Sequence, residues 1–430
     1  MADQRGRHWT VSESSSRELD NGLQGRVDKP CRRTARLLPR RRHSEEPDPE
    51  PYDTIGIKDG KSFVQGTDKE LLAERSAFLR PDSLVAIILL TDENDRSIRD
   101  VGKSFNAAQL GTQKNPVHLH RARHECEADP DDACCKSCNA TLGDCSVDPT
   151  CSEPVTDKYD PTNLRGFDQK KRFGIDFLYP LDRSTSALTK ATVPNRAGER
   201  VPNPLFPKPD AAAGVRSPRT AEGGLVFLAG IVGVPWQDIA RRSADGKPDL
   251  RAGFDANHKA VGGFKTAREL GDRDAKGKTV RDQILGDPSK KILPSDPLMR
   301  ESRGVRTGNV PSTTEDLAGL DAQSPTANII NGHEWDTSKS AAGDLQYACI
   351  FPLPVPNVDC QATGCDCNTE AKNPLCQDET GAYTSTQFRA KAYPGARELG
   401  VLKEIGDQGI VASVCPAQLD HSLFITCSGE

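Results

Sequence analysis

The chain has 430 residues, of which 35% are hydrophobic and 5% aromatic, and it contains 36 glycines and 31 prolines. This length leaves room for two or three domains, but the composition predicts long irregular segments between the buried elements. A formal net charge of −5 implies neither a nucleic-acid nor a membrane-surface partner, and no apolar run approaches the roughly 18 residues that span a bilayer.

Residues 1–65 are predicted to be a disordered tail. A basic run, Cys31 to His43, is followed at once by the acidic, proline-rich run Ser44 to Pro51. Blocks of opposite charge without periodic apolar positions cannot bury enough surface to offset the entropy lost on ordering.

Residues 66–115 are predicted to hold one buried strand and its flanking helices. Thr67 to Phe78 has a helical pattern in which Thr67 or Asp68 is placed to cap the first turn. Leu84 to Leu90 is an unbroken apolar run. Such a run favours a strand that is buried on both faces, as in a parallel sheet covered by helices.

Three acids, Asp92, Glu93 and Asp95, follow that strand within four residues, and Asn94 lies between the last two. Ligands of open α/β sheets bind outside the carboxyl ends of the strands, so we expect Asp92 to point into such a crevice. The alternative is that Asp92 caps a following helix, with Glu93 and Asp95 in its first turn.

Residues 116–160 form a cysteine-rich insertion that also carries three histidines. Adjacent and regularly spaced cysteines in a polar segment favour disulfide bonds, which are typical of an oxidising compartment. The alternative is a structural zinc site drawn from the same ligand types, including the Cys135/Cys138 pair. The candidate residues are His118, His120, His124, Cys126, Cys134, Cys135, Cys138, Cys145 and Cys151.

The remaining chain is predicted to be α/β with long loops over 161–345, a second cysteine-rich segment over 346–385, and a helix and strand over 386–430. Strands are predicted at Phe173–Pro180, Leu225–Trp236, Leu345–Leu353 and Gly409–Pro416, and a helix at Pro394–Gly406. The stretches 181–222 and 241–325 are predicted to be insertions or disordered. The second set of disulfide candidates is Cys349, Cys360, Cys365, Cys367, Cys376 and Cys415.

This cysteine usage predicts an extracellular or cell-envelope location, yet the first twenty residues lack the apolar core of a secretion signal. We therefore expect the authentic start, with its signal, to lie upstream of this sequence.

The run Leu84 to Ser97 resembles the fourth strand of a von Willebrand factor type A domain, whose closing aspartate belongs to a metal-ion-dependent adhesion site. Further segments are similar to a cysteine-rich group of such proteins from large-genome bacteria of the myxobacterial type. They are Arg172–Arg183, Val226–Ala240, Asn331–Asp336, Leu345–Leu353 and Ala390–Pro416. The resemblance implies a mostly parallel α/β sheet, incomplete at its N-terminus and interrupted by cysteine-rich insertions.

The same resemblance implies Thr91, Asp92 and Asp95 as metal ligands, with Mg²⁺ or Ca²⁺ as the ion if the site is intact. The family also needs an Asp-x-Ser-x-Ser loop upstream of this strand, and residues 1–77 contain none. Asp182 to Ser186 has that pattern but lies downstream, and Arg96 stands where the group usually has a cysteine. The sequence therefore predicts a degraded adhesion site.

The predicted function is non-catalytic binding or adhesion in the cell envelope or outside it, with a protein as a compatible partner and no catalytic or cofactor-binding residues. The oligomeric state is not predicted. One alternative is a zinc-stabilised module over Cys126–Cys151 that serves an unknown hydrolase. The other is a truncated gene product without function.

Overall fold

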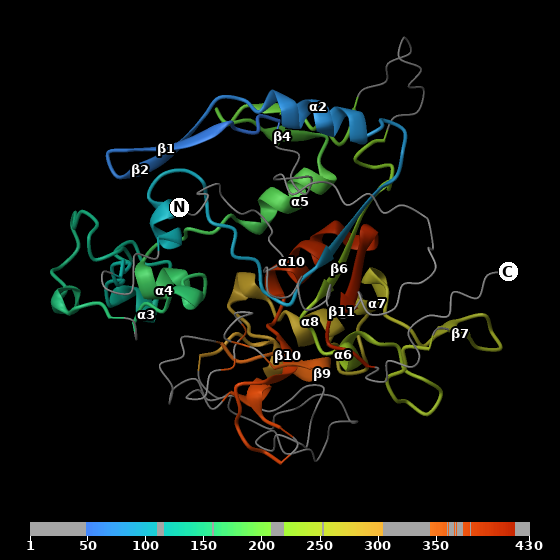
Figure 1. The fold of residues 1–430 in the computed structure, drawn as a ribbon. Coiled ribbons are helices and arrows are strands. Elements are labelled where there is room, and N and C mark those ends of the chain that lie inside the picture. Colours follow the sequence, from blue (N-terminus) through green and yellow to red (C-terminus); the bar gives the residue numbers. More distant parts are fainter. Residues whose placement is uncertain are drawn as a thin grey trace, which may run out of the picture.

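A computed structural model describes residues 49–109, 116–156, 159–207, 219–251, 253–303 and 345–358, and most of 360–417 apart from 361–364, 366, 368–372 and 379. These residues form a mixed α/β structure with a small parallel sheet (Figure 1). Several of its segments are bonded by disulfides. No helix among them is both long and apolar enough to span a membrane.

The elements follow one another in chain order as short helices and strands. They are β1 (Thr54–Lys58), β2 (Lys61–Gln65), α2 (Lys69–Phe78), β3 (Val85–Leu90), α3 (Glu125–Ala128), α4 (Gln169–Phe173), α5 (Leu181–Thr189), β4 (Thr192–Pro194), β5 (Arg200–Pro202), β6 (Val226–Val232), α6 (Trp236–Ile239), β7 (Gly253–Phe254), β8 (Ala260–Val261), α7 (Ala267–Gly271), α8 (Val280–Ile284), β9 (Cys349–Asn357), β10 (Gln387–Ala392), α10 (Ala396–Ile405) and β11 (Gly409–Ser413).

The central sheet has three parallel strands in the order β11-β6-β3. The register places Ile88 beside Ala229 and Ala229 beside Ile410. All three apolar runs that the sequence marked as continuous strands are therefore in one sheet, as predicted. The order follows the chain without a reversal among the described strands, so the crevice at their carboxyl ends does not mark a switch point of the kind expected.

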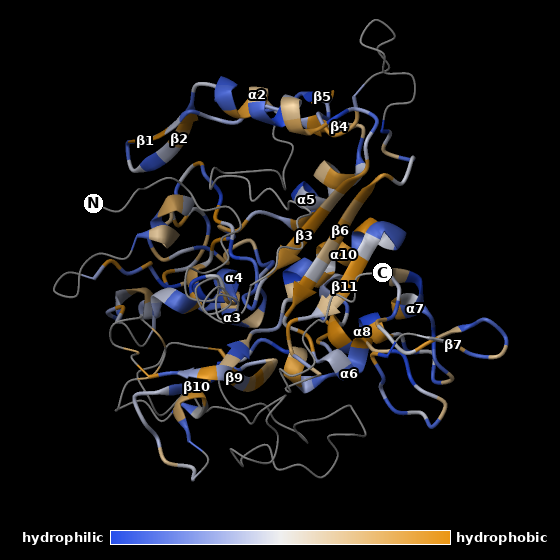
Figure 2. Cartoon of the chain, turned by 45° about the vertical axis from the view of Figure 1, so that its right-hand side comes forward, coloured by the Kyte–Doolittle hydropathy of each residue, from blue (hydrophilic) through white to orange (hydrophobic). Residues whose placement is uncertain are grey.

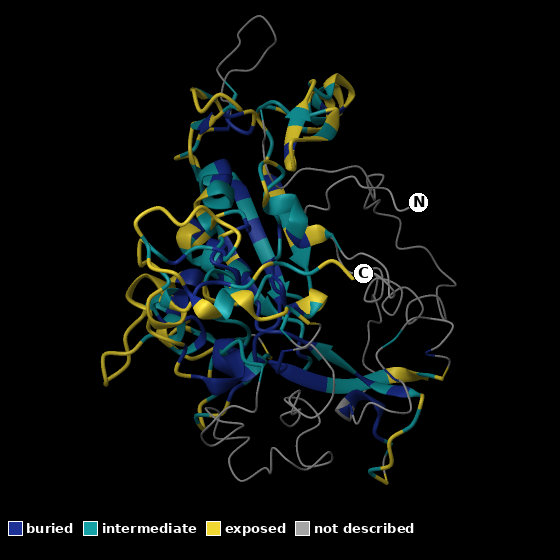
Figure 3. Ribbon diagram, turned by 90° about the vertical axis from the view of Figure 1, so that its left-hand side faces the viewer, coloured by how far each residue is buried: buried dark blue, intermediate teal, exposed yellow. Residues whose placement is uncertain are grey.

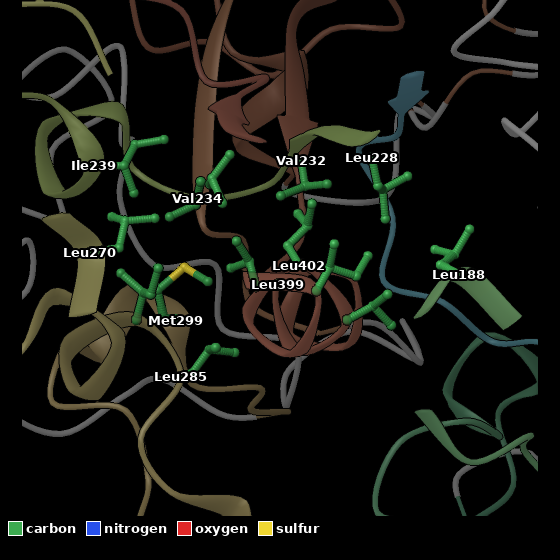
Figure 4. Packing of buried hydrophobic residues seen from close by; sticks show 14 of the residues in the cluster. Leu188, Leu228, Val232, Val234, Ile239, Leu270, Leu285, Met299, Leu399 and Leu402 are labelled. Carbon is green, nitrogen blue, oxygen red and sulfur yellow. The ribbon is translucent and has the colours of Figure 1, made fainter. Parts of the chain in front are cut away.

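Helix α10 covers one face of this sheet. Its Leu399 and Leu402 point into the main hydrophobic cluster, between Met299 on one side and Leu228 on the other (Figure 4). Close packing requires Gly230 in the middle strand, because a Cβ there would lie 2.6 Å from Leu402 Cδ1. Helix α5 packs against the outer side of α10, and Leu188 joins the same cluster. Buried residues concentrate around this layer (Figure 3).

The opposite face of the sheet is largely uncovered by described residues, which corrects the prediction that β3 is buried on both faces. Ile88 is 69% exposed and Ile410 is 51% exposed, whereas Val232 is fully buried. The strands remain apolar throughout (Figure 2). The prediction failed because β3 is an edge strand and the described helices that pack on the sheet lie on one side, which an apolar run alone does not reveal.

The predicted tail is wrong over residues 54–65, which form the antiparallel hairpin β1–β2. Its turn residues Asp59 and Gly60 have φ values of 52° and 67°, as a two-residue type I′ turn requires. The Asp59-Gly60 pair is the sequence signal from which this hairpin could have been predicted. Residues 1–48, with the basic and acidic runs up to that point, lie outside the described residues. Helix α2 is capped as predicted, since Asp68 Oδ1 accepts a hydrogen bond from Leu71 N at 2.8 Å.

Two predicted strands are corrected by the structure. In the predicted strand Phe173–Pro180, Phe173 ends α4 and only residues near Leu178 pair, with the segment around Ile98. The Leu345–Leu353 strand begins at Cys349 and pairs antiparallel with β10 instead of joining the parallel sheet. The long loops are also not structureless, because 181–202 holds α5 and a hairpin and 253–284 holds β7, β8, α7 and α8.

All twelve predicted disulfide cysteines are paired. The insertion contains Cys126–Cys135, Cys134–Cys145 and Cys138–Cys151. The second segment contains Cys360–Cys365 and Cys367–Cys376, and Cys349–Cys415 ties β9 to the chain after β11. This number of bridges is typical of an oxidising, extracellular setting.

Candidate functional site

The carboxyl edge of the sheet is where the chain after β3 meets the chain after β10. Thr91 N donates to Ile231 O at 3.1 Å, and Tyr393 N donates to Asp92 O at 2.7 Å. Gly233 allows this crossing, because a Cβ at that position would lie 1.8 Å from the Tyr393 carbonyl oxygen. The backbone of Asp92 is therefore fixed between two strand ends.

A pocket of ≈ 380 Å³ opens beside Asp92. Its charged lining residues include Asp92 and Glu93 from the end of β3, Arg96 from the same loop, and Lys391 from β10. A third base, Arg165, also lines it. The remaining lining residues are Ile98, Ala107, Thr162, Asn163, Gly166, Phe177, Leu178, Cys365, Gln387, Ala390 and Tyr393. Asp92 thus lies at a crevice outside a strand end, which is the position that the sequence predicted.

The two bases are held in different ways. Arg96 Nη1 donates to Asn163 O at 2.8 Å. Lys391 Nζ lies 5.5 Å from the ring centre of Tyr347 and 5.1 Å from that of Tyr393, within the range of a cation–π interaction. Asn163 therefore helps to hold Arg96, and the two tyrosine rings help to hold Lys391.

A third lining cation, Arg165, is engaged by the protein. Its guanidinium pairs with buried Asp160 at 2.8 Å and also donates to the carbonyl oxygens of Ala107, Gln109 and Val117. Its charge is matched by that of Asp160.

The pocket lining offers no imidazole and no free thiol among its described residues. The described residues around the pocket include no histidine, and their one cysteine, Cys365, is bonded to Cys360. Covalent catalysis needs a nucleophile within hydrogen-bond reach of a base. The arrangement is suited to hold a ligand that carries charges of both signs.

Behind the pocket, the acidic loop binds the start of α10. Asn94 Oδ1 accepts a hydrogen bond from Arg397 N at 3.0 Å, which satisfies an amide in the first turn of the helix. Asp95 Oδ2 lies 3.1 Å from Arg397 Nε, and Asp95 Oδ1 accepts from Ser97 N at 2.8 Å. The structure therefore differs from the alternative in which Asp92 caps the helix that follows it in the chain. The side chain that binds a helix start here is Asn94, and the helix is α10, which lies 303 positions later.

Glu398, also in the first turn of α10, is buried at 2% exposure. Burial, followed by the nearby charge of Asp95, raises the pKa of Glu398 to about 8. A neutral Glu398 therefore lies next to the ion pair of Asp95 with Arg397. Sequence analysis missed Glu398, although its spacing to Leu402 and Ile405 placed it on the apolar face of the predicted helix.

The three residues that the resemblance implied as metal ligands are not gathered into one oxygen cage. Asp92 lines the pocket, but Thr91 Oγ1 accepts a hydrogen bond from Glu93 N at 3.1 Å within its own turn. Asp95 is engaged by Arg397, whose positive charge opposes a cation there. This arrangement does not fit the six or more oxygen ligands of Mg²⁺ or Ca²⁺.

The downstream Asp-x-Ser-x-Ser pattern does not supply the missing oxygens. Asp182 is exposed in the first turn of α5, and neither it nor Ser184 or Ser186 lines the pocket. An ion bound by Thr91, Asp92 and Asp95 stays a prediction without further ligands among the described residues.

The cysteine-rich insertion leaves no thiolate for the zinc alternative, because its six cysteines are all in disulfides. The histidines also separate. His118 Nδ1 lies 3.7 Å from Asp160, whereas His124 Nδ1 lies 3.0 Å from Asp148. A zinc site built from the cysteines predicted for it is therefore absent from the described insertion.

Comparisons of the chain with models of protein families, with curated proteins and with solved structures found no significant match. The function must therefore be inferred from the geometry. Lys391 was also missed as a lining residue, and no sequence signal identified it, since it reaches the pocket from a strand almost 300 residues beyond Asp92.

Proposed function

We propose that this is a non-catalytic binding or adhesion protein that acts in the cell envelope or outside it and holds its partner at the pocket beside Asp92. The observation that carries the proposal is the composition of that pocket, which pairs Asp92 and Glu93 with Arg96 and Lys391 at the carboxyl edge of a parallel sheet. Such a surface suits a protein segment with neighbouring acidic and basic side chains.

We also propose a relationship to von Willebrand factor type A domains. It is supported by the sequence likeness around Leu84–Ser97 and by the place of Asp92 at the end of a parallel strand. In this proposal the metal-ion-dependent adhesion site is degraded, since Asp95 bonds Arg397 and Thr91 bonds its own turn. Recognition then relies on the protein's own charges. The six disulfides support the extracellular setting.

The test is binding of the oxidised full chain to an array of short peptides, in which peptides with adjacent acidic and basic residues are compared with neutral peptides of equal length. Selective binding of the mixed-charge peptides is expected. Asp92→Asn with Glu93→Gln, and separately Lys391→Gln, should weaken it at least about tenfold, because each change removes a charge-assisted contact.

Glu404→Gln provides the matched control, because this exposed glutamate on α10 does not line the pocket. Its binding should equal that of the unmodified chain. If no peptide binds, or if the pocket variants bind as well as the control, the proposal is wrong.

A further inference from the structure

A second group of ligating side chains lies in the cysteine-rich insertion, away from the pocket. His124 Nδ1 is 3.0 Å from Asp148 Oδ2 and 3.5 Å from Glu125 Oε2. All three ligand atoms lie within 4.8 Å of one another. Among the described residues, this is the group in which a histidine and two carboxylates bring their ligand atoms so close together.

The spacing fits one tetrahedral ion. Zinc bonds nitrogen and oxygen ligands at about 2.0–2.2 Å, which places neighbouring ligand atoms about 3.3 Å apart. The two distances from His124 Nδ1 lie on either side of that value. The two carboxylate oxygens lie within 4.8 Å of each other. They would have to approach by at most about 1.5 Å to share one tetrahedral coordination shell.

Hydrogen bonds from neighbouring groups orient both carboxylates. Asp148 Oδ1 accepts from Thr150 N at 2.9 Å and from Thr150 Oγ1 at 2.7 Å. Asp148 Oδ2 accepts from His124 N at 2.6 Å, which holds this oxygen beside the His124 ring. Glu125 Oε1 accepts from Arg123 Nη2 at 3.1 Å. Partners of this kind fix metal ligands in place and tune their affinity.

Glu125 Oε2 is the oxygen that faces the centre. It is buried and accepts no hydrogen bond from the described residues. A buried carboxylate oxygen without a donor is costly unless a proton or cation meets it. Arg123 offsets one of the two negative charges, so the group retains a net charge of −1 and attracts a dication.

Disulfides hold the two halves of this group together. Cys126, next to Glu125, is bonded to Cys135, and Cys151, three residues beyond Asp148, is bonded to Cys138. The ligands are thus arranged before any ion arrives, which lowers the entropy cost of binding.

We propose that His124, Glu125 and Asp148 form a binding site for a divalent transition metal of the zinc class. One imidazole and two carboxylates suit zinc, and three protein ligands leave a fourth position. His124 is on the surface, so that fourth position is open to water or to a side chain of a partner. This site is independent of the pocket and of its proposed peptide ligand.

The test uses the oxidised full chain, stripped with a chelator and then titrated with zinc alone by calorimetry, with metal analysis after dialysis. One equivalent of zinc is expected. Cobalt in place of zinc should give the visible absorption of a tetrahedral complex. Glu125→Gln, which preserves the side-chain shape, and His124→Ala should each weaken binding at least about tenfold.

His120→Ala is the control, because His120 is an exposed histidine of the same insertion that is not in the cluster. It should bind zinc like the unmodified chain. Non-reducing peptide mapping confirms that each variant keeps its three disulfides. Zinc binding that is absent, that is unaffected by Glu125→Gln and His124→Ala, or that needs reduced thiols would overturn the proposal.

Discussion

Glu398 is a buried acid beside the residues that join the acidic loop to α10. It follows Arg397, which bonds Asp95, and it is buried, as are Leu402 and other apolar residues of α10. The start of a helix favours a carboxylate, yet burial outweighs that effect and raises the pKa of Glu398 to about 8. The carboxyl group is therefore kept neutral by its surroundings.

This raised pKa predicts a pH-dependent stability. The folded state holds the Glu398 proton up to about pH 8, whereas the unfolded chain releases it near the ordinary glutamate pKa of 4.5. The contribution to the free energy of unfolding is thus fully present below pH 4.5 and is lost as the pH rises through 8. Urea unfolding between pH 5 and 9 should show a decline of a few kcal/mol, on the order of 1.4 kcal/mol per pKa unit.

Glu398→Gln should flatten this decline, because its amide is neutral throughout the range. Glu404→Gln, on the exposed side of the same helix, should leave the decline unchanged. Equal pH profiles for the unmodified chain and Glu398→Gln would show that Glu398 does not titrate in this way.

At the scale of elements, the sequence identifies strands and helices whose patterns are local, and it does not identify how they are covered. The apolar runs at β3, β6 and β11 and the helix α10 were all predicted, because each pattern is complete within one segment. The exposure of Ile88 depends on which segments pack on the outer face of the sheet.

The candidate site likewise has some residues that a local sequence pattern predicts and others that it does not. Asp92 was placed at a crevice because it directly follows a strand, and the twelve disulfide cysteines were recognised as a set by their spacing. Lys391, Glu398 and the cysteine pairing depend on contacts between distant segments, as in Cys349–Cys415. Such contacts leave no mark in a local pattern.

Because the sheet is buried on one side, we expect truncation of a strand side chain to alanine to destabilise the fold far more on the buried face than on the exposed face. Ile88→Ala should change the free energy of unfolding by no more than about 0.5 kcal/mol, as for an exposed position. Leu228→Ala removes a buried side chain that packs with α10 residues and should cost about 2–5 kcal/mol. Both are measured by urea unfolding. A large cost for Ile88→Ala would mean that the outer face is covered in solution.

For the whole molecule, disulfides compensate for a small core. The sheet has three strands, the aromatic content is 5%, and the described helices are short. Six bridges restrict the unfolded chain, and one of them, Cys349–Cys415, joins the antiparallel pair β9–β10 to the parallel sheet. The two sheets are therefore linked covalently as well as by α10.

The bridges should contribute unequally because the loops they close differ in length. Cys349–Cys415 spans 66 positions and Cys360–Cys365 spans 5. The entropy of loop closure then predicts that Cys349→Ala with Cys415→Ala costs about 4 kcal/mol, and Cys360→Ala with Cys365→Ala about 2 kcal/mol. Urea unfolding of both double variants, with the other bridges verified by peptide mapping, measures the difference. An equal cost for the two pairs would show that local packing around the cysteines, and not restriction of the unfolded chain, determines their contribution.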